Sequence, residues 1–209
     1  MRYKLVIFDF DGTLADSFPW FCRILNEVAD RFGFRRTEPH EIDTLRTMGA
    51  RDLMRHFGIP AWKMPFIAHH IRKRKSHELD QTRLFDGVDR MLRELSDASI
   101  ALALVTSNSE PNARTILGAG NASLIRTYEC GVAMFGKASR FRRVLRRTGI
   151  PAADAICIGD EIRDLEAARK EGIALGAVTW GYTMPEALIA RGPAVVFRSM
   201  DEVADHLLR

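Results

Sequence analysis

Acidic residues follow two apolar segments of the chain, at the point where each segment ends. Asp9 and Asp11 come directly after the run KLVIF at residues 4–8. Asp160 follows a second run, AICI at residues 155–158. Runs of this kind are typical of strands buried on both faces of a parallel sheet, and ligands bind at the carboxyl ends of such strands. The three carboxylates are therefore expected at one sheet edge, where oxygen ligands without paired His or Cys favour Mg²⁺ over zinc.

Asp9 and Asp11 are separated by one residue, so in an extended chain their side chains point to the same side. Buried carboxylates are costly unless a cation meets them, although a single aspartate after a strand is also compatible with a helix-capping role. Glu161 and Asp164 follow Asp160 within one helical turn and add negative charge. This number of carboxylates favours a cation site over separate helix caps.

Hydroxyl, amide and amine groups are expected near the same edge. Thr106 follows the apolar run ALALV at residues 101–105 and is followed by Ser107 and Asn108. Together they offer a hydroxyl group and backbone N–H donors for phosphate oxygens. Lys137, in a loop just before a predicted helix, offers a cation. Each residue is commonplace by itself, and their order along the chain is what indicates one site.

The elements that must position these groups alternate between strands and helices. The apolar strand signature occurs at residues 4–8, 101–105, 155–158, 173–178 and 194–197. Helical stripes at 88–95 and 138–147 lie between these strands and carry charged residues on their opposite faces. This alternation predicts an α/β fold with a parallel sheet.

Residues 15–82 have a different pattern, with helical periodicity, many charges and no convincing strand. Ser17 is expected to cap a helix that ends at Gly33. Further helices are predicted at residues 41–48, 50–57 and 62–79. We therefore predict an all-helical insertion at 15–82, placed after the first strand of a core made of residues 1–14 and 83–209.

The composition bounds the class of protein. With 209 residues, of which 46% are hydrophobic, the chain is long enough for one medium domain plus an insertion. Three cysteines without a C-x-x-C pair indicate neither a disulfide framework nor a zinc site, which favours a reducing cytoplasm. No stretch has the pattern of a signal peptide or a membrane span. We expect a cytoplasmic protein without a membrane partner.

The formal net charge of +4 is a mild excess that is spread over the chain. Stacking aromatic residues and recognised nucleic-acid-binding motifs are missing, so no nucleic-acid partner is expected. The densest basic group is a row on the helix predicted at 138–147: Arg140, Arg142, Arg143, Arg146 and Arg147. We interpret this row as a solvated helix face rather than an anion-binding patch.

Four short motifs occur in the order of a known family. DFDGTLADS resembles the D-x-D-G-T motif of the haloacid dehalogenase superfamily, VTSN resembles its second motif, Lys137 its third, and GDEIRD its fourth. The helical insertion resembles the cap of the phosphoglycolate phosphatase-like branch. The resemblance implies a Rossmann-like core of three layers and a Mg²⁺-dependent phosphatase for a small phosphorylated metabolite. The chain departs from its relatives at Ala138, where many carry Pro, and between residues 117 and 135, where the third strand is less hydrophobic than expected.

The resemblance also implies catalytic roles. Asp9 is the nucleophile that forms an aspartyl phosphate, and Asp11 is the general acid and base. Asp9, Asp160 and the backbone carbonyl of Asp11 hold Mg²⁺. Lys137 adds positive charge at the nucleophile, and Thr106 binds a phosphate oxygen.

Further residues are expected to support the site. Those assigned to the metal site and its cation are Thr13, Glu161 and Asp164. Ser107 and Asn108 are expected to bind the phosphate. Arg46 and Arg51 of the insertion are candidates for binding a substrate carboxylate, such as that of phosphoglycolate, and an outward orientation is the alternative. The sequence WGY at residues 180–182 resembles a loop of some relatives, and packing is its expected role.

Alternative functions within and beyond the family stay open. A phosphomutase keeps both aspartates and is distinguished by a bisphosphate-dependent assay. A catalytically silent phosphate-sensing or protein-binding module usually lacks a motif residue, and this chain lacks none. A haloacid dehalogenase needs neither Mg²⁺ nor a second carboxylate, so Asp11 and Gly12 argue against it. A monomer or a homodimer is expected.

Overall fold

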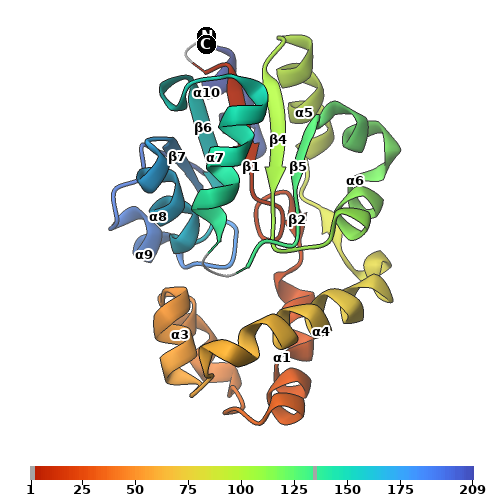
Figure 1. The fold of residues 1–209 in the computed structure, drawn as a ribbon, viewed down its shortest axis with the longest axis vertical. Coiled ribbons are helices and arrows are strands. Elements are labelled where there is room, and N and C mark those ends of the chain that lie inside the picture. The colour runs from red at the N-terminus through yellow and green to blue at the C-terminus, as the bar shows by residue number, and fades with distance from the viewer. Residues whose placement is uncertain (1–2, 134–135) are drawn as a thin grey trace.

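The centre of the protein is a parallel sheet with helices on both faces (Figure 1). The computed structural model describes residues 3–133 and 136–209. The 6-stranded sheet has the order β5-β4-β1-β6-β7-β8, and all neighbouring strands are parallel. The strands are β1 (Leu5–Phe8), β4 (Ala101–Val105), β5 (Thr127–Glu129), β6 (Ala155–Gly159), β7 (Ala174–Val178) and β8 (Val195–Phe197). The prediction of a Rossmann-like α/β core is confirmed.

Residues of the central strand β1 alternate between two apolar cores. Val6 and Phe8 belong to the core beneath α5 (Val88–Asp97), α6 (Glu110–Leu124) and α10 (Met200–Leu208). Leu5 and Ile7 belong to the core beneath α7 (Lys137–Thr148), α8 (Ile162–Glu171) and α9 (Pro185–Ile189). All four residues of β1 are completely buried. An uninterrupted apolar run is what a strand covered on both faces requires.

The helices that pack on the sheet are amphipathic, as predicted. Helix α5 buries the stripe Val88, Met91, Leu92 and Leu95. Helix α7 buries Phe141 and Val144, whereas Leu145 packs at the margin of the core. Within the described part of the chain, no helix has the length and apolarity to cross a membrane. The apolar faces of α5 and α7 pack against the sheet.

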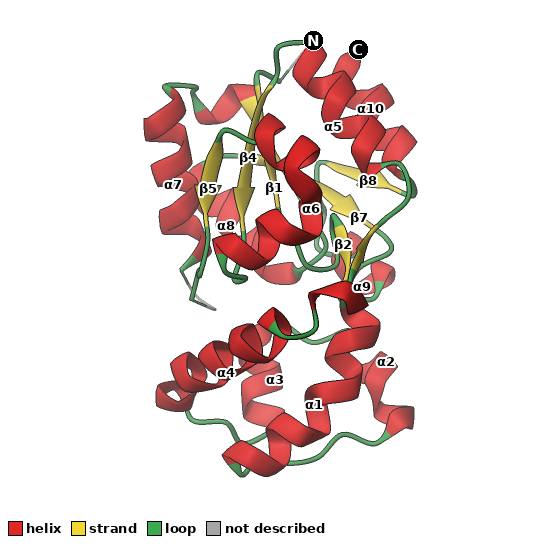
Figure 2. Ribbon diagram, turned by 90° about the vertical axis from the view of Figure 1, so that its right-hand side faces the viewer, coloured by secondary structure: helices red, strands yellow, loops and turns green. Residues whose placement is uncertain are grey.

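Residues 18–81 form a helical layer beyond the carboxyl ends of the strands (Figures 1 and 2). Its α-helices are α1 (Phe18–Phe32), α2 (Ile42–Leu45), α3 (Ala50–His56) and α4 (Met64–Ser76). The chain enters and leaves this layer through an antiparallel ribbon made of β2 (Ala15–Asp16) and β3 (Arg83–Leu84). The prediction of no strand in 15–82 is therefore wrong for two residues, because a pair this short leaves no periodicity in the sequence.

Strand β5 is the edge strand whose position the sequence left open. It contains only Thr127, Tyr128 and Glu129, and only Glu129 is buried. Because β5 pairs with β4 alone and lies at the sheet edge, it does not need a continuous apolar run. Residues 134–135, which come shortly before Lys137 in the sequence, lie outside the described residues.

Helix α1 begins after Ser17 and ends at Gly33, as predicted. Gly33 has φ 64° and its N–H bonds to the carbonyl of Ala29, which is the left-handed termination that favours glycine. Ser17 makes no side-chain capping bond, so that part of the prediction is wrong. Its hydroxyl lies 3.1 Å from the Tyr182 hydroxyl instead, since a tertiary contact takes the place of the cap.

Candidate active site

Asp9 lies at the carboxyl end of β1, next to a buried lysine. Its side chain is 2% exposed, and the Phe10 N–H donates to its Oδ1 at 2.7 Å. Lys137, the first residue of α7, places Nζ 2.7 Å from Asp9 Oδ2 and also contacts Asp164. Burial lowers the pKa of Lys137, but Asp164 and Asp9 outweigh that effect and raise the pKa above its usual value. The lysine is therefore held as a cation between two carboxylates.

Three carboxylates converge at this point. One oxygen from each of Asp9, Asp160 and Asp164 lies within 4.8 Å of the others, and all three residues are buried. Burial raises the pKa of Asp9 to about 6, with Lys137 opposing this shift and Asp164 adding to it. Burial, together with Glu161, raises the pKa of Asp160 well above its usual value. Both directions reflect carboxylates removed from water, whose ionised form is costly unless a cation meets it.

The charges around the cluster can be counted among the described residues. Four carboxylates take part: Asp9, Asp160, Glu161 and Asp164. Two cations pair with them: Lys137 and Arg163. The excess of two negative charges matches the charge of one divalent ion. Asp9 Oδ2 is also buried without an aligned hydrogen bond. This oxygen-only donor set fits Mg²⁺.

Both oxygens of Asp160 accept a hydrogen bond. The Thr13 hydroxyl donates to Oδ1 at 2.6 Å, and the Tyr182 N–H donates to Oδ2 at 2.7 Å. Gly12 lies against the same carboxylate with φ 83°, and a Cβ at this position would lie 2.4 Å from Oδ2. Glycine is therefore required here for both its conformation and its size. Asp160 is held in one orientation by neighbours on two sides.

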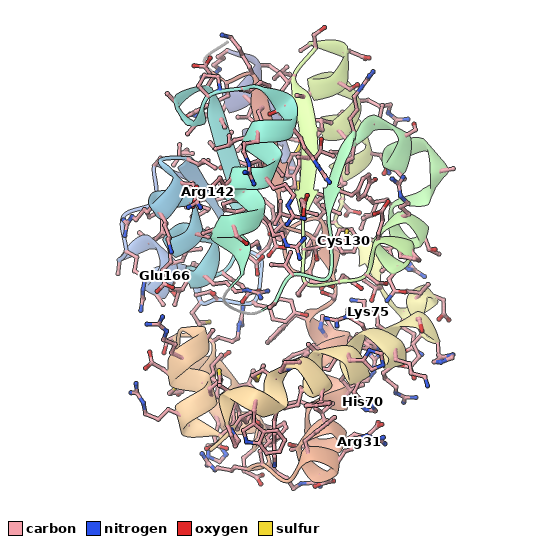
Figure 3. All side chains as sticks on the ribbon, viewed as in Figure 1. Arg31, His70, Lys75, Cys130, Arg142 and Glu166 are labelled. Atoms are coloured by element: carbon pink, nitrogen blue, oxygen red, sulfur yellow. The ribbon has the colours of Figure 1, made fainter. Side chains whose placement is uncertain are left out.

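Asp11 lies where the sheet meets the helical layer. Its side chain is 20% exposed, and the Asn108 side-chain amide donates to Oδ2 at 3.1 Å. The buried Lys75 of α4 donates to Asp11 Oδ1 at 2.7 Å, and its Nζ lies 4.8 Å from the ring centre of Trp20. Figure 3 shows Lys75 on the side of α4 that faces the sheet. Asp11 therefore connects the sheet edge with the helical layer.

The residues predicted to bind phosphate form a turn after β4. Thr106 is completely buried, and its Oγ1 accepts the Asn108 N–H at 3.0 Å. The Ser107 carbonyl accepts a hydrogen bond from Arg72 of the helical layer at 3.4 Å. Because Asn108 also binds Asp11, the turn is fixed beside that carboxylate.

The two arginines predicted to bind substrate have different surroundings. Arg46 Nε donates to the Tyr182 carbonyl at 3.0 Å, and its Nη2 donates to the Gly181 carbonyl at 2.9 Å. Its remaining nitrogen, Nη1, lies 3.5 Å from Asp43. Arg51 is exposed on α3. The structure therefore gives Arg46 backbone partners beside the site and places Arg51 at the surface.

Two cations at the site were not among the predicted residues. Arg163 lies inside the fourth motif at a position whose residue type the motif does not specify, and it pairs with Glu161. Lys75 follows Ile67 and Ile71 at intervals of four residues, so it shares the helix face that packs in the helical layer. A lysine on the apolar face of a helix was the available signal for Lys75.

The arginine row on α7 has a role that the sequence did not indicate. Glu129 of β5 is buried, and its carboxylate lies 2.8, 3.4 and 2.8 Å from Arg140, Arg143 and Arg147. These arginines are partly exposed, as expected for a helix face, yet they also neutralise a buried carboxylate. The interpretation of a purely solvated face is therefore incomplete. The ion pairs hold α7, and with it Lys137, against the edge strand.

The sequence matches the family model described as haloacid dehalogenase-like hydrolase over residues 6–178. The chain belongs to this family. One relative of this hydrolase is the phosphoglycolate phosphatase of Synechococcus elongatus, which is 33% identical over 191 residues, covering 91% of this chain and 90% of the relative. Another is the N-acetylmuramic acid 6-phosphate phosphatase of Pseudomonas aeruginosa, 27% identical with coverages of 89% and 86%. The prediction of a phosphoglycolate phosphatase-like enzyme of the haloacid dehalogenase superfamily is confirmed.

Solved structures agree with the fold of this haloacid dehalogenase-like hydrolase. The crystal structure of a predicted phosphatase from Clostridium acetobutylicum has a TM-score of 0.81 and 22% identity, and the match covers 100% of this chain and 99% of that chain. At this identity the likeness shows the fold alone. The match therefore extends over the sheet and the helical layer together.

Proposed function

We propose that this hydrolase cleaves a small phosphate monoester with the aid of Mg²⁺, through a phosphorylated Asp9. The observation that carries the proposal is the buried cluster of Asp9, Asp160 and Asp164 with Lys137 paired to Asp9. A carboxylate beside a cation and a metal site can attack a phosphoryl group, because the same positive charges neutralise that group. Phosphoglycolate is the compound named in the first relative described above.

The chemistry divides into two displacements at phosphorus. First, an Asp9 oxygen bonds to phosphorus while the bond to the leaving-group oxygen breaks, and Asp11, which starts the reaction protonated, gives that oxygen its proton. Asp11 then takes a proton from water, and the water oxygen attacks phosphorus. The bond between Asp9 and phosphorus breaks, which releases inorganic phosphate and restores both aspartates.

The remaining site residues bind and orient. Asp9, Asp160 and the Asp11 carbonyl are the proposed Mg²⁺ ligands, and the ion supplies positive charge for the transferring phosphoryl group. Lys137 adds a second positive charge at the nucleophile, and Asp164 holds Lys137 in place. The proposed phosphate-binding residues are Thr106, Ser107 and Asn108.

The helical layer is proposed to act as a cap that contacts the leaving group and excludes water. In this division, residues 15–82 are the cap and residues 1–14 and 83–209 are the catalytic core. Lys75 lies beside Asp11, where the leaving group departs in the proposed reaction. A leaving group with a carboxylate suits this cationic side, which makes phosphoglycolate the leading substrate.

The test is phosphate release from a panel of small phosphate esters that includes phosphoglycolate, measured with Mg²⁺ and with a chelator. We expect Mg²⁺-dependent release by the wild type and its loss in Asp9→Asn. Asp16→Asn is the matched control, because Asp16 is an exposed aspartate on β2. Thermal unfolding of each variant separates lost chemistry from lost folding.

The outcomes distinguish the functional classes. Phosphate release that persists in Asp9→Asn would remove the proposed nucleophile. Conversion between phosphorylated isomers that depends on a bisphosphate would indicate a mutase. Binding of phosphate esters without turnover would indicate a sensing module.

A further inference from the structure

The turn at residues 180–182 lies directly on the carboxylate of Asp160. The Tyr182 N–H donates to Asp160 Oδ2 at 2.7 Å. Trp180 Nε1 donates to the Thr13 carbonyl at 3.1 Å, and the Thr13 hydroxyl donates to the other oxygen of Asp160 at 2.6 Å. The turn therefore contacts Asp160 directly and also through Thr13.

There is no free space between this turn and Asp160. A Cβ on Gly181 would lie 2.1 Å from the Asp160 Cβ and 2.4 Å from its Oδ2. Real Cβ atoms do not approach other atoms so closely, so the glycine backbone is in contact with the aspartate side chain. Because the packing is this close, a shift of the turn displaces the carboxylate.

The helical layer holds the same turn through Arg46. Its guanidinium donates to two successive carbonyls, those of Gly181 and Tyr182, at 2.9 and 3.0 Å. The carbonyl of Arg46 accepts the Met184 N–H at 3.0 Å. The guanidinium carbon lies 4.8 Å from the ring centre of Phe18, so the planar group is held from its face as well.

The Tyr182 side chain adds a second connection to the helical layer. Its hydroxyl lies 3.1 Å from Ser17 Oγ. Its ring packs against Phe18 and Phe21 of α1, with centroid distances of 5.0 and 5.6 Å. The residue that donates to Asp160 through its backbone is thus bound to α1 through its side chain.

We propose that Arg46 is a positioning residue, which couples the placement of the helical layer to the orientation of Asp160 through the turn 180–182. This inference rests on the proposed function, in which Asp160 holds Mg²⁺. Partners that orient a metal ligand commonly affect metal affinity by about 10- to 100-fold. Without Arg46, the two carbonyls lose their shared donor, and Asp160 keeps a less fixed hydrogen-bond donor on Oδ2.

Isothermal calorimetry with MgCl₂ on the full chain tests this inference without an activity assay. We expect the Mg²⁺ dissociation constant to rise about 10-fold in Arg46→Met. A smaller rise is expected in Arg46→Lys, because an ammonium cannot reproduce the planar fork to two carbonyls. Arg55→Met is the matched control, since Arg55 is an arginine of the same layer whose side chain is 80% exposed.

Two further variants keep the test decisive. In Gly181→Ala, the added methyl group would clash with the Asp160 side chain. We expect this variant to bind Mg²⁺ more weakly although Arg46 is intact. Asp160→Asn is the reference for the metal site itself. Thermal unfolding in a chelator shows whether each variant is folded, and Arg46→Lys serves if Arg46→Met is not.

The possible failures are distinguishable. Mg²⁺ binding that is unchanged in Asp160→Asn would remove the metal assignment and with it part of the proposed function. Binding that is lost in Asp160→Asn but unchanged in folded Arg46→Met and Arg46→Lys would overturn the positioning role alone. A rise in KM for phosphoglycolate with unchanged Mg²⁺ affinity would assign Arg46 to the substrate carboxylate instead.

Discussion

The sheet edge and the helical layer meet at the same site but are held together in different ways. The strands β1 and β6 that lead to Asp9 and Asp160 are buried along their whole length. The apolar cluster of the helical layer consists of Trp20, Ile24, Val28 and Ile67 with partly buried neighbours. That layer also exposes Trp62 and Phe66, at 66% and 62%. Its contacts with the site include hydrogen bonds from Lys75 and Arg46 and the packing of Phe18 and Phe21 on Tyr182.

This difference separates the chemistry from the selection of substrate. Buried strands hold the carboxylates of the site in fixed positions. Attack on phosphorus requires such fixed positions. A helical layer with a small apolar cluster of its own can shift at lower cost than a strand buried in the sheet. Changes at the sheet edge should therefore affect folding and turnover together, whereas changes in the layer away from Arg46 should affect substrate preference.

The largest expected effect is that of Lys137→Met. It leaves Asp9 and Asp164 as uncompensated buried charges, so we expect the free energy of unfolding to fall by about 3–5 kcal/mol. Turnover should fall by about a thousandfold in addition. Urea unfolding and phosphate release measure the two effects, with the exposed Lys170→Met of α8 as control. A variant that lost turnover without losing stability would show that the ion pairs do not support the sheet edge.

Matched isoleucines test the difference in packing. Ile7 of β1 is completely buried, and Ile24 of α1 is 4% exposed. We expect the free energy of unfolding to fall by about 4 kcal/mol in Ile7→Ala and by about 2 kcal/mol in Ile24→Ala. The second value is smaller because the neighbours of Ile24 can relax into the space. Hydrogen exchange measured at increasing urea concentration gives the free energy of unfolding of the sheet and of the helical layer in each variant. Equal losses would mean that the helical layer is as tightly packed as the sheet.

A smaller and selective effect is expected from Lys75→Met. Removing the partner of Asp11 should lower kcat/KM for phosphoglycolate roughly 10-fold, the size of one charge-assisted hydrogen bond. A phosphate ester without a carboxylate should be affected less. Lys73→Met is the control, because Lys73 is an exposed lysine of the same helix. An equal loss for both esters would assign Lys75 to Asp11 alone rather than to the leaving group.

The smallest effect is expected from Trp62→Gln. The residue is 66% exposed, so the free energy of unfolding should change by less than about 0.5 kcal/mol. Thermal unfolding measures the stability of this variant. Trp20→Phe, in the interior of the same layer, is the variant with which it is compared. A large loss at Trp62 would show that this ring is covered in solution.

The sequence located strands best where burial on both faces allows only apolar residues. β1, β4 and β6 were located within one residue, because strands covered on both faces stand out as uninterrupted apolar runs. β5 was not located, since an edge strand tolerates the sequence TYE. Its buried residue, Glu129, is charged and is neutralised by arginines 11 or more positions away. Such a pairing depends on tertiary placement and has no local pattern.

The same reasoning explains which side chains of the site could be predicted from the sequence. Asp9, Asp160 and Lys137 were placed together because they follow strands or begin a helix at one sheet edge. Lys75 was missed because it stands in the run RKRKS, where composition indicates solvent exposure and only helix periodicity reveals the apolar face. The bond from Tyr182 to Asp160 is invisible to sequence reasoning, since it uses a backbone N–H that almost any residue has.

The ribbon of β2 and β3 has a consequence for how this architecture diversifies. Ala15 pairs with Leu84 and Asp16 with Arg83, so the two ends of the inserted segment are hydrogen-bonded neighbours. An insert whose ends already meet adds little closure entropy as it lengthens, about 0.6 kcal/mol for each doubling. Recombination at this ribbon can thus exchange one set of helices for another without stretching the sheet. A lineage can acquire new substrates by grafting at one two-stranded stem while it inherits the strands that carry Asp9 and Asp160.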